Sequence, residues 1–272
     1  GEKTYVDDVF STLLYTGNGS TQNIVNGIDL AGEGGLTWIK SRSLGVSHIL
    51  TDTARGAGNR INSNSNAGNS SSTNFLSSFN DNGFSVGNDN DVNYNNQTFS
   101  SFSFRKSPGF FDVVSYSGNG QNYRGVSHNL GCTPGLILIK RYNGAGIDWK
   151  CYCNGDGYTT HPSLNNTYAT WEAQATSQGY VGGVDKNGLH LRPGYNGGFN
   201  SVNSAGQEYV MYLFAGGFVG NALNSTTASS CDFASSKSLQ IAESADFGFG
   251  TGDYTVEFWW QFRNLTTQTA LF

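Results

Sequence analysis

Two loops in the second half of the sequence contain the residue types that bind sugars. The first contains Asp148, Trp149 and Tyr152, and the second contains Tyr195 and Phe199 among glycines and asparagines. An aromatic ring can stack on a sugar ring, while carboxylates and amides bind its hydroxyl groups. These five residues form a hypothetical glycan site. The more common arrangement is the alternative, in which Trp149 and Tyr152 fill a core and Tyr195 covers a loop.

Glycoside hydrolysis is the enzymatic chemistry closest to such a site. It requires two carboxylates that flank the bond, about 5 Å apart for retention or about 6.5 to 9.5 Å for inversion. Glucanases with a concanavalin-like fold place theirs as E-x-D-x-x-E on one strand, and the chain contains no such string. The acidic candidates show no pairing in the sequence: Glu33, Asp52, Asp148, Asp156 and Glu172. We therefore expect no enzyme, and we expect Asp52 to pair with Arg55 or with a loop backbone.

Metal and cofactor binding find little support in the sequence. Residues 87–91 place oxygen ligands at alternating positions, but they lack the closing glutamate of a calcium loop, so a solvated acidic loop is favoured. The histidines lie far apart, and the cysteines lack zinc-knuckle spacing, which favours free buried thiols. These residues are His48, His128, His161 and His190, and Cys132, Cys151, Cys153 and Cys231. We expect no metal site and no cofactor.

Charge and hydropathy exclude two classes of partner. The net charge is −5, and the densest basic pairs, Arg105-Lys106 and Lys140-Arg141, are isolated. A nucleic-acid-binding protein usually carries a stripe of lysines and arginines, so we expect no nucleic acid. No apolar run approaches the roughly 20 residues that span a bilayer, so we expect no membrane insertion.

The composition predicts an all-β protein. The chain has 272 residues, with 37 Gly, 30 Asn and 31 Ser but only 4 Pro, and aromatic residues make up 14%. Gly, Asn and Ser favour turns over helices, whereas aromatic residues favour strands. An asparagine-rich tract over residues 59–98 is interpreted as solvated loops, with a ligand-facing array as the alternative. A short helix within residues 163–176 is left open.

An internal repeat of about 100 residues organises the chain. The strings YTGNG and YSGNG, which begin at Tyr15 and Tyr116, are each followed about 20 residues later by GLTWIK and GLILIK. Two further pairs keep the order: DNGFSVG with DKNGLHL, and FSSFSF with YVMYLF. We therefore predict two homologous β-sandwich repeats, jelly-roll-like, over residues 1–109 (repeat 1) and 110–217 (repeat 2).

Each shared string predicts a local structure. GLILIK is a short apolar run between Pro134-Gly135 and Asn143-Gly144, which indicates a strand buried on both faces. FSSFSF alternates apolar and polar residues, as in a strand with one wet face. The Gly-Asn-Gly tripeptides predict positive φ in a tight hairpin-type turn.

Residues 218–272 predict a linker followed by the start of a third domain. The segment TVEFWWQF, residues 255–262, places four apolar side chains on one face. Fifty-five residues with such a face are too few to bury it alone. We therefore expect the opening strands of a further domain that is cut off at Phe272.

Several of these strings also resemble a known family. YTGNGSTQNIVNGIDLAGEGGLTWIKSR, HILTDTARG and NDNGFSVG resemble the repeat domain of tail-fibre-like structural proteins of marine bacteriophages, including cyanophages. In that family FFDVVSYSGNG introduces a second copy, which contains H-x-L-G-x-x-P-G, as residues 128–135 do. The segment SLQIAESADFGFGTGDYTVEFWWQF resembles the start of a laminin-G or concanavalin-like jelly roll.

The resemblance implies a viral structural protein. It implies a tail fibre or virion-surface appendage that mediates host attachment by binding a glycan or a surface protein. Other virion proteins and host cell-surface polysaccharide would be its partners, and a homo-oligomer, a trimer by resemblance, would be its assembled state. It would be assembled in the host cytoplasm and act outside the cell. The alternatives are a capsid-decorating or cementing protein and, third, a glycan depolymerase.

Overall fold

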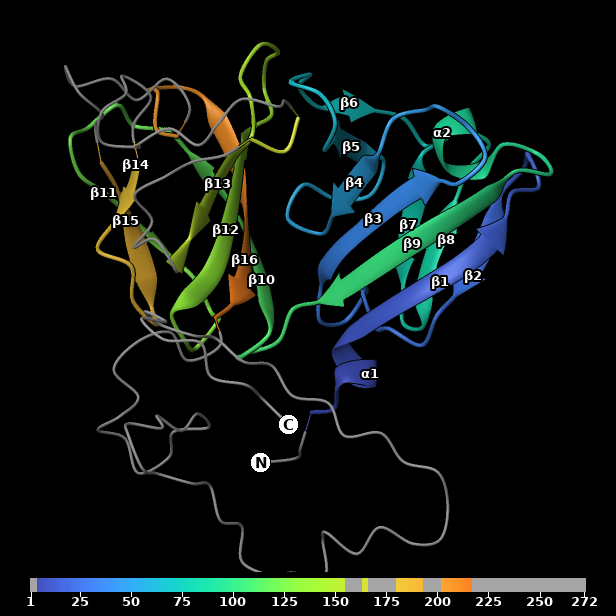
Figure 1. Ribbon diagram of the computed structural model, residues 1–272, viewed down its shortest axis with the longest axis horizontal. Helices are drawn as coiled ribbons and strands as arrows, with labels where there is room; N and C mark the ends of the chain where they lie inside the picture. Colours follow the sequence, from blue (N-terminus) through green and yellow to red (C-terminus); the bar gives the residue numbers. More distant parts are fainter. Residues whose placement is uncertain (1–3, 155–162, 166–179, 193–201, 217–272) are drawn as a thin grey trace, which may run out of the picture. The chain divides into compact units, whose positions relative to one another are not determined.

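A computed structural model describes residues 4–154, 163–165, 180–192 and 202–216 of the chain, and these residues form an all-β fold. Strands dominate these ranges, and the two α-helices, α1 (Val6–Val9) and α2 (Asn90–Asn93), have four residues each. All strand pairs are antiparallel. The predicted fold class of tandem β-sandwich repeats is confirmed, while the expected third domain lies outside the described residues (Figure 1).

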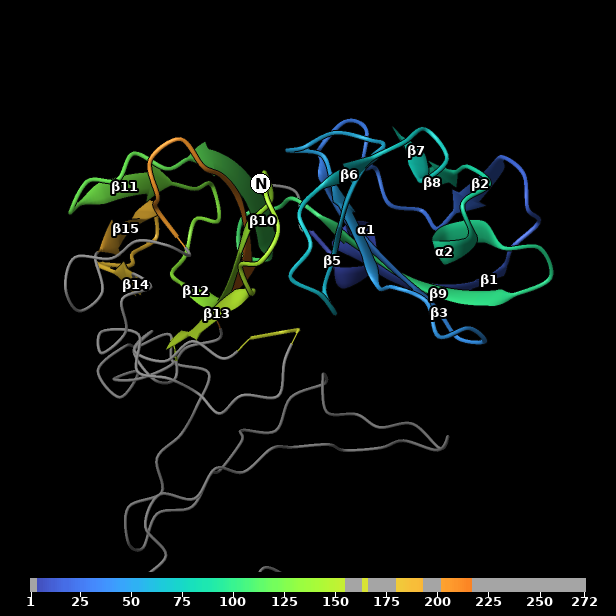
Figure 2. The ribbon, with the colours of Figure 1, turned by 90° about the horizontal axis from the view of Figure 1, so that it is seen from above.

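Repeat 1 is a sandwich of two sheets, which Figure 2 shows as separate layers. The larger sheet has the order β1 (Phe10–Thr16), β9 (Thr98–Arg105), β3 (Gly35–Ser41), β4 (Ile49–Asp52), β5 (Asn59–Asn62) and β6 (Ser70–Ser71). The smaller sheet has the order β2 (Gln22–Val25), β8 (Gly83–Val86) and β7 (Leu76–Asn80).

Repeat 2 reproduces this topology except for β5 and β6, which have no counterpart among its described residues. Its larger sheet has the order β10 (Phe111–Ser117), β16 (Glu208–Ala215), β12 (Pro134–Arg141) and β13 (Lys150–Cys153). Its smaller sheet has the order β11 (Arg124–Ser127), β15 (Gly188–Arg192) and β14 (Tyr180–Gly182). Strands β1, β9, β3 and β4 thus correspond to β10, β16, β12 and β13, and β2, β8 and β7 correspond to β11, β15 and β14.

Each sandwich encloses its own core. In repeat 1, Ile39 and Phe99 of the larger sheet pack with Phe84 of the smaller sheet. In repeat 2, Ile137 of β12 packs with Leu189 of β15 in the same way. The alternation of strand side chains supplies these inward faces, because every second residue points to the same side of a sheet.

A third apolar cluster joins the two repeats, and it explains strands that are buried on both faces. Its members come from the outward sides of the two larger sheets: Leu36, Leu50, Ile61, Phe111, Val113, Leu138, Trp149, Cys151, Val210 and Tyr212. We call this cluster the shared core. In β12, Ile137 and Ile139 belong to the core of repeat 2 while Leu138 belongs to the shared core, which confirms the prediction for GLILIK. Residues 1–220 accordingly form one compact unit.

The strand FSSFSF departs from the predicted pattern of one wet face. In β9 the serines Ser101 and Ser103 are buried inside the sandwich, where their hydroxyl groups meet Leu13 and Asn26. Phe104 lies on the outward face instead, because that face continues into the shared core. The outward face is therefore apolar where repeat 2 covers it.

The turns that begin within YTGNG and YSGNG connect the two sheets of a sandwich rather than two paired strands. The positive φ expected there occurs at Gly19 (69°) and Gly120 (67°). The hairpin prediction was wrong, because β1 and β2 belong to different sheets, as do β10 and β11. No helix in the described ranges is long and apolar enough to cross a membrane.

Candidate functional site

The structure places two of the five predicted sugar-binding residues in the protein interior. Trp149 and Tyr152 are both 0% exposed, Trp149 in the shared core and Tyr152 in the core of repeat 2. The indole Nε1 of Trp149 donates to the backbone oxygen of Asn62 at 2.9 Å. Neither ring offers the open face that sugar stacking requires, so these two residues fill cores, as the alternative interpretation expected. Tyr195 and Phe199 lie outside the described residues.

Asp148, the third predicted residue, is part of a local polar network. The side-chain amide of Asn165 donates to its Oδ1 at 2.7 Å. Asp148 also attracts two buried lysines, Lys140 and Lys150, which flank it in sequence. Burial lowers the pKa of both ammonium groups, to about 8 for Lys140, and the attraction of Asp148 opposes that effect. The carboxylate therefore compensates buried positive charge within the protein.

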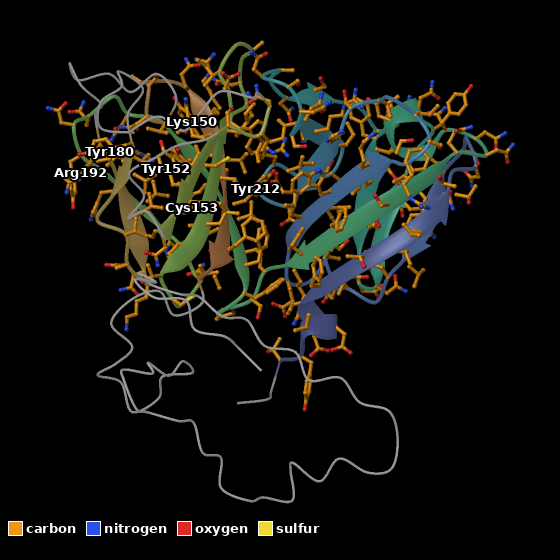
Figure 3. All side chains as sticks on the ribbon, viewed as in Figure 1. Lys150, Tyr152, Cys153, Tyr180, Arg192 and Tyr212 are labelled. Atoms are coloured by element: carbon orange, nitrogen blue, oxygen red, sulfur yellow. The ribbon has the colours of Figure 1, made fainter. Side chains whose placement is uncertain are left out.

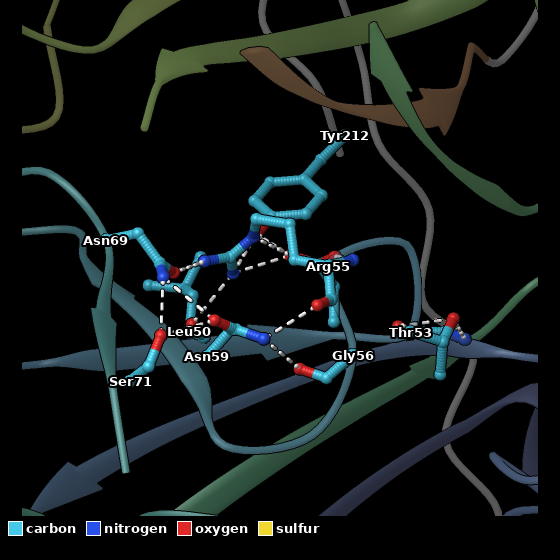
Figure 4. Close-up of polar contacts among 10 residues, drawn as sticks. Leu50, Thr53, Arg55, Gly56, Asn59, Asn69, Ser71 and Tyr212 are labelled. Atoms are coloured by element: carbon cyan, nitrogen blue, oxygen red, sulfur yellow. Dashed lines mark hydrogen bonds and ion pairs between the residues drawn. The ribbon is translucent and has the colours of Figure 1, made fainter. Parts of the chain in front are cut away.

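The strongest concentration of chemically capable groups lies where the two repeats meet (Figure 4). Asp52 at the end of β4 receives two hydrogen bonds from Arg55, from the backbone N–H at 2.9 Å and from Nε at 2.7 Å. The hydroxyl group of Tyr212, from β16 of repeat 2, donates to Asp52 Oδ2 at 2.7 Å. We call Asp52, Arg55 and Tyr212 the junction cluster. The predicted pairing of Asp52 with Arg55 is confirmed.

The remaining donors of Arg55 are also used. Nη1 donates to Asn69 Oδ1 at 2.9 Å, and Nη2 donates to the backbone oxygen of Leu50 at 3.1 Å. The side chains of Arg55 and Asp52 are 2% and 0% exposed. A buried charge pair is stable only when further hydrogen bonds satisfy both ions, and here they do.

The electrostatics of the junction cluster favour a locked ion pair. Burial and the adjacent carboxylate of Asp52 raise the pKa of Tyr212 well above its usual range, so its hydroxyl group stays protonated as a donor. Burial disfavours the charge of Arg55, but Asp52 and Tyr212 outweigh this, and the pKa of the guanidinium is raised. The side chains of the cluster are almost completely closed to solvent. It has the character of a cross-link between repeats rather than of an active site.

Backbone contacts extend this junction into adjacent loops. Asn69 N donates to the oxygen of Tyr142 at 2.7 Å, and Gly146 N donates to the oxygen of Asn66 at 3.1 Å. The ammonium group of Lys140 donates to the same Asn66 oxygen at 3.1 Å. An open groove of about 550 Å³ follows these loops and is lined by Ala67, Gly68, Asn69, Ser70, Tyr142, Asn143, Gly144 and Ala145. Most of its lining residues are small.

Two equivalent asparagines, which the sequence alone did not single out, hold the Gly-Asn-Gly turns. In repeat 1, Asn93 accepts from Asn18 N at 2.9 Å and donates to the Asn18 side chain and to the backbone oxygens of Ser20 and Gly87. In repeat 2, Asn203 makes the corresponding contacts with Asn119 and with the Gln121 oxygen. We call each pair an asparagine clasp.

A sequence signal for the clasp does exist. Residues 92–99 read VNYNNQTF and residues 202–209 read VNSAGQEY, which share V-N-x-x-x-Q and a following aromatic residue. The hydroxyl groups of Tyr15 and Tyr116 donate to the oxygens of Val92 and Val202, the valines of these strings. The clasp thus belongs to the repeat and is a device of the fold.

The other candidates serve structural roles or lie outside the description. In the acidic run, Asp89 caps α2, and Arg60 pairs with Asp89 and Asp91 at 3.2 and 2.9 Å. Of the described cysteines, Cys151 is a buried free thiol, as predicted, Cys132 is a half-buried free thiol, and Cys153 is half-buried. Within the described ranges, His, Cys, Asp and Glu form no group that could hold a metal ion. The candidates outside these ranges are Asp156, His161, Glu172 and Cys231.

Comparison with known proteins identifies the family of the chain. A family model described as a domain of unknown function, DUF7483, matches residues 6–234. No curated protein and no solved structure matches the chain.

Proposed function

The chain belongs to the DUF7483 family of domains of unknown function, and we propose that it is a non-enzymatic structural protein of a virion. In this proposal the two repeats form a stiff segment of a tail fibre or another surface appendage that attaches the particle to its host. The proposed location rests on the resemblance of the repeat strings to tail-fibre-like proteins of marine phages.

The observation that carries the structural role is the junction between the repeats. A flexible tandem would be joined by a linker and a small polar interface. Here ten buried residues from both repeats form the shared core, and the buried ion pair of Asp52 and Arg55 is bonded across it to Tyr212. We expect such a unit to resist bending between its two sandwiches, because bending would expose the shared core to water. The side chains of Asp52 and Arg55 are almost fully enclosed, which leaves this ion pair inaccessible to a substrate.

Labelling of intact particles tests the proposed location. Antibody fragments raised against residues 1–220 would be bound to purified phage particles and imaged by electron cryomicroscopy. Density on a tail appendage supports the proposal. Regular density over the capsid lattice would contradict the proposal and support the decorating or cementing function. If no antibody fragment binds the particles, the chain is not on the particle surface, and both functions are excluded.

Two assays on the purified chain test attachment and the absence of catalysis. We expect the chain to reduce adsorption of particles to host cells when it is added first, because it occupies the receptor. We also expect no release of reducing ends from host polysaccharide at high protein concentration. Release of such ends would favour the depolymerase function.

A further inference from the structure

The outward face of the smaller sheet of repeat 2 carries a group of rings and a cation, of which one ring is exposed and the other members are half-buried. Tyr123 directly precedes β11, Tyr180 begins β14, and His190 and Arg192 belong to β15. We call these four residues the ring–cation patch. Figure 3 labels Tyr180 and Arg192 together, on the side of repeat 2 away from Tyr212.

Tyr123 contacts both His190 and Arg192. The rings of Tyr123 and His190 are stacked, with centroids 4.1 Å apart, and the guanidinium carbon of Arg192 lies 5.2 Å from the centroid of Tyr123. Arg192 pairs with Tyr180 across the sheet and extends over Gly182. Tyr123 nevertheless remains 54% exposed. Within the described part of the chain, no carboxylate forms an ion pair with Arg192.

Repeat 1 provides an internal comparison, because it builds the same sheet from different residues. The central row of this face in repeat 2 is Gly125, His190 and Gly182. The corresponding row in repeat 1 is Asn23, Ser85 and Ser78. The Ser85 hydroxyl group donates to Asn23 Oδ1 at 2.7 Å and accepts from Asn80 at 3.0 Å. The polar groups of repeat 1 thus satisfy one another within the sheet.

The two rows differ in what they leave available to other molecules. Glycines on both sides of His190 give it no side-chain partner in its row, and its ring stacks on the exposed Tyr123 instead. Its Nδ1 is buried beside Gly125 without a hydrogen-bond partner. Arg192 follows Leu191 just as Gly87 follows Val86, so Gly87 is the counterpart of Arg192 in repeat 1. A side chain at Gly87 would collide with the backbone, because a Cβ there would lie 2.5 Å from Asn74. Repeat 1 therefore folds without a ring or a cation on this face, so the fold does not require them in repeat 2.

We infer that the ring–cation patch binds a sugar that carries an acidic group. Exposed tyrosine presents a flat apolar surface to a pyranose ring. Arginine recognises a planar carboxylate or a sulfate through a fork of two parallel N–H donors. Among the described residues, Arg124 directly follows Tyr123 in the sequence, and Asp185, which interacts with His190, is followed by Lys186. With Arg192, these groups comprise three cations and one carboxylate. An anionic glycan matches this combination better than a neutral one.

This inference deepens the proposed attachment role and rests on it for its biological meaning. The uronic acids and the sulfated sugars of cell surfaces share the chemistry described above, so the experiment includes both. Calorimetric titration of the full chain would use alginate oligosaccharides, sulfated dextran, unmodified dextran and single-stranded DNA. We expect saturable binding of one or both acidic polysaccharides and none of unmodified dextran or DNA.

Variants locate the binding. Arg192→Gln and Tyr123→Thr are each expected to weaken binding about tenfold or more. His190→Ser gives β15 the residue of repeat 1 and is expected to weaken binding as well. The matched control is Asn23→Ala, on the equivalent face of repeat 1, which should leave the affinity unchanged. Circular dichroism verifies that every variant is folded.

Three results would overturn the inference. The first is no binding of either acidic polysaccharide by the folded chain at millimolar concentration. The second is equal binding of DNA, which would mean attraction to any polyanion. The third is acidic-sugar binding that survives Arg192→Gln and Tyr123→Thr, which would place the site elsewhere. None of these outcomes depends on where the chain lies in a particle, so this inference and the proposed function can fail separately.

Discussion

The ion pairs in the described part of this protein differ in burial, and their effect on stability depends on it. The ion pair of Asp52 and Arg55 is almost fully buried, whereas Arg60 and its partner Asp89 are 18% and 25% exposed. Water screens the second pair and is excluded from the first. The two pairs therefore allow a controlled comparison of the same chemistry in two environments.

Asp52→Asn is expected to lower the free energy of unfolding by about 3–5 kcal/mol. The variant leaves the Arg55 guanidinium buried without a negative charge. Asp89→Asn is the control, because asparagine still caps α2 and only a partly exposed pair is lost, for about 1 kcal/mol or less. Urea unfolding measures both values. Equal losses would contradict the role of Asp52 as the buried counter-charge of the junction cluster.

Lys140 predicts a specific dependence of stability on pH. Burial lowers its pKa from 10.5 to about 8 in the folded protein. Between these two pH values the unfolded chain binds more protons than the folded one, so the free energy of unfolding contributed by Lys140 rises with pH. Below pH 8 Lys140 is protonated in both the folded and the unfolded chain, so the folded protein bears the full free-energy cost of burying its positive charge.

The variant Lys140→Met removes this titration. We expect the difference in free energy of unfolding, native minus variant, to rise from pH 7 to pH 10 by a few kcal/mol, because one pKa unit corresponds to about 1.4 kcal/mol. Burial raises the pKa of Cys151 to about 12, which acts in the opposite direction, but this contribution is common to both proteins and cancels. A difference that is flat or falls with pH would contradict the assignment.

At the scale of elements, the asparagine clasps fix the crossing from one sheet to the other. Gly17 and Gly118 start the two turns, and a Cβ there would lie 2.3 and 2.1 Å from the backbone oxygens of Tyr94 and Ser204. Glycine is required at these positions because the chains approach so closely. The turn and the clasp segment are therefore pressed together, and the asparagine supplies the hydrogen bonds between them.

Removing a clasp should destabilise either repeat to a similar extent. Asn93 and Asn203 are both 0% exposed, so truncation to alanine leaves several buried partners without a hydrogen bond. We expect Asn93→Ala and Asn203→Ala each to cost about 2–4 kcal/mol in thermal or urea unfolding. Asn129→Ala, at an exposed position, should change stability by less than about 0.5 kcal/mol. Large losses in only one repeat would show that the clasps are not equivalent.

The sequence predicted the elements well because each depends on local pattern. GLILIK and its neighbours encode a strand by apolar content and by bounding turns, and the order of shared strings encodes the duplication. The outward Phe104 and the buried Ser101 show the limit of that reasoning. Alternation reveals which residues share a face, but only the packing of the two sheets decides which face is covered.

The candidate site was predictable only in part, for a related reason. Aromatic residues beside polar ones are typical both of sugar sites and of cores, and burial separates the two, as at Trp149 and Tyr152. The pairing of Asp52 with Arg55 was predictable because the two residues are three positions apart. The contribution of Tyr212 was not, because it lies 157 positions beyond Arg55. The ring–cation patch required the register of three strands before its members could be seen as neighbours.

At the scale of the molecule, the shared core makes the two repeats one thermodynamic unit. Leu138 lies in β12 of repeat 2, but it packs in a cluster that includes Leu36, Leu50 and Ile61 of repeat 1. Neither larger sheet can expose this face without placing several large apolar side chains in water. The unfolding of one repeat therefore removes the support of the other.

Leu138→Ala tests this coupling by hydrogen exchange. The variant should lower the free energy of the opening reaction that exposes amide protons to exchange by about 2–5 kcal/mol, the usual cost of truncating a buried leucine. Amide protons in β8 and β15 lie in the smaller sheets, one in each repeat and neither in the shared core. If the repeats unfold together, protection in both strands falls by the same amount. The control Leu14→Ala, at a side chain that is 63% exposed, should leave both unchanged. Loss of protection in β15 alone would mean that the sandwiches are separate units, and the stiff segment proposed for the appendage would then have a hinge.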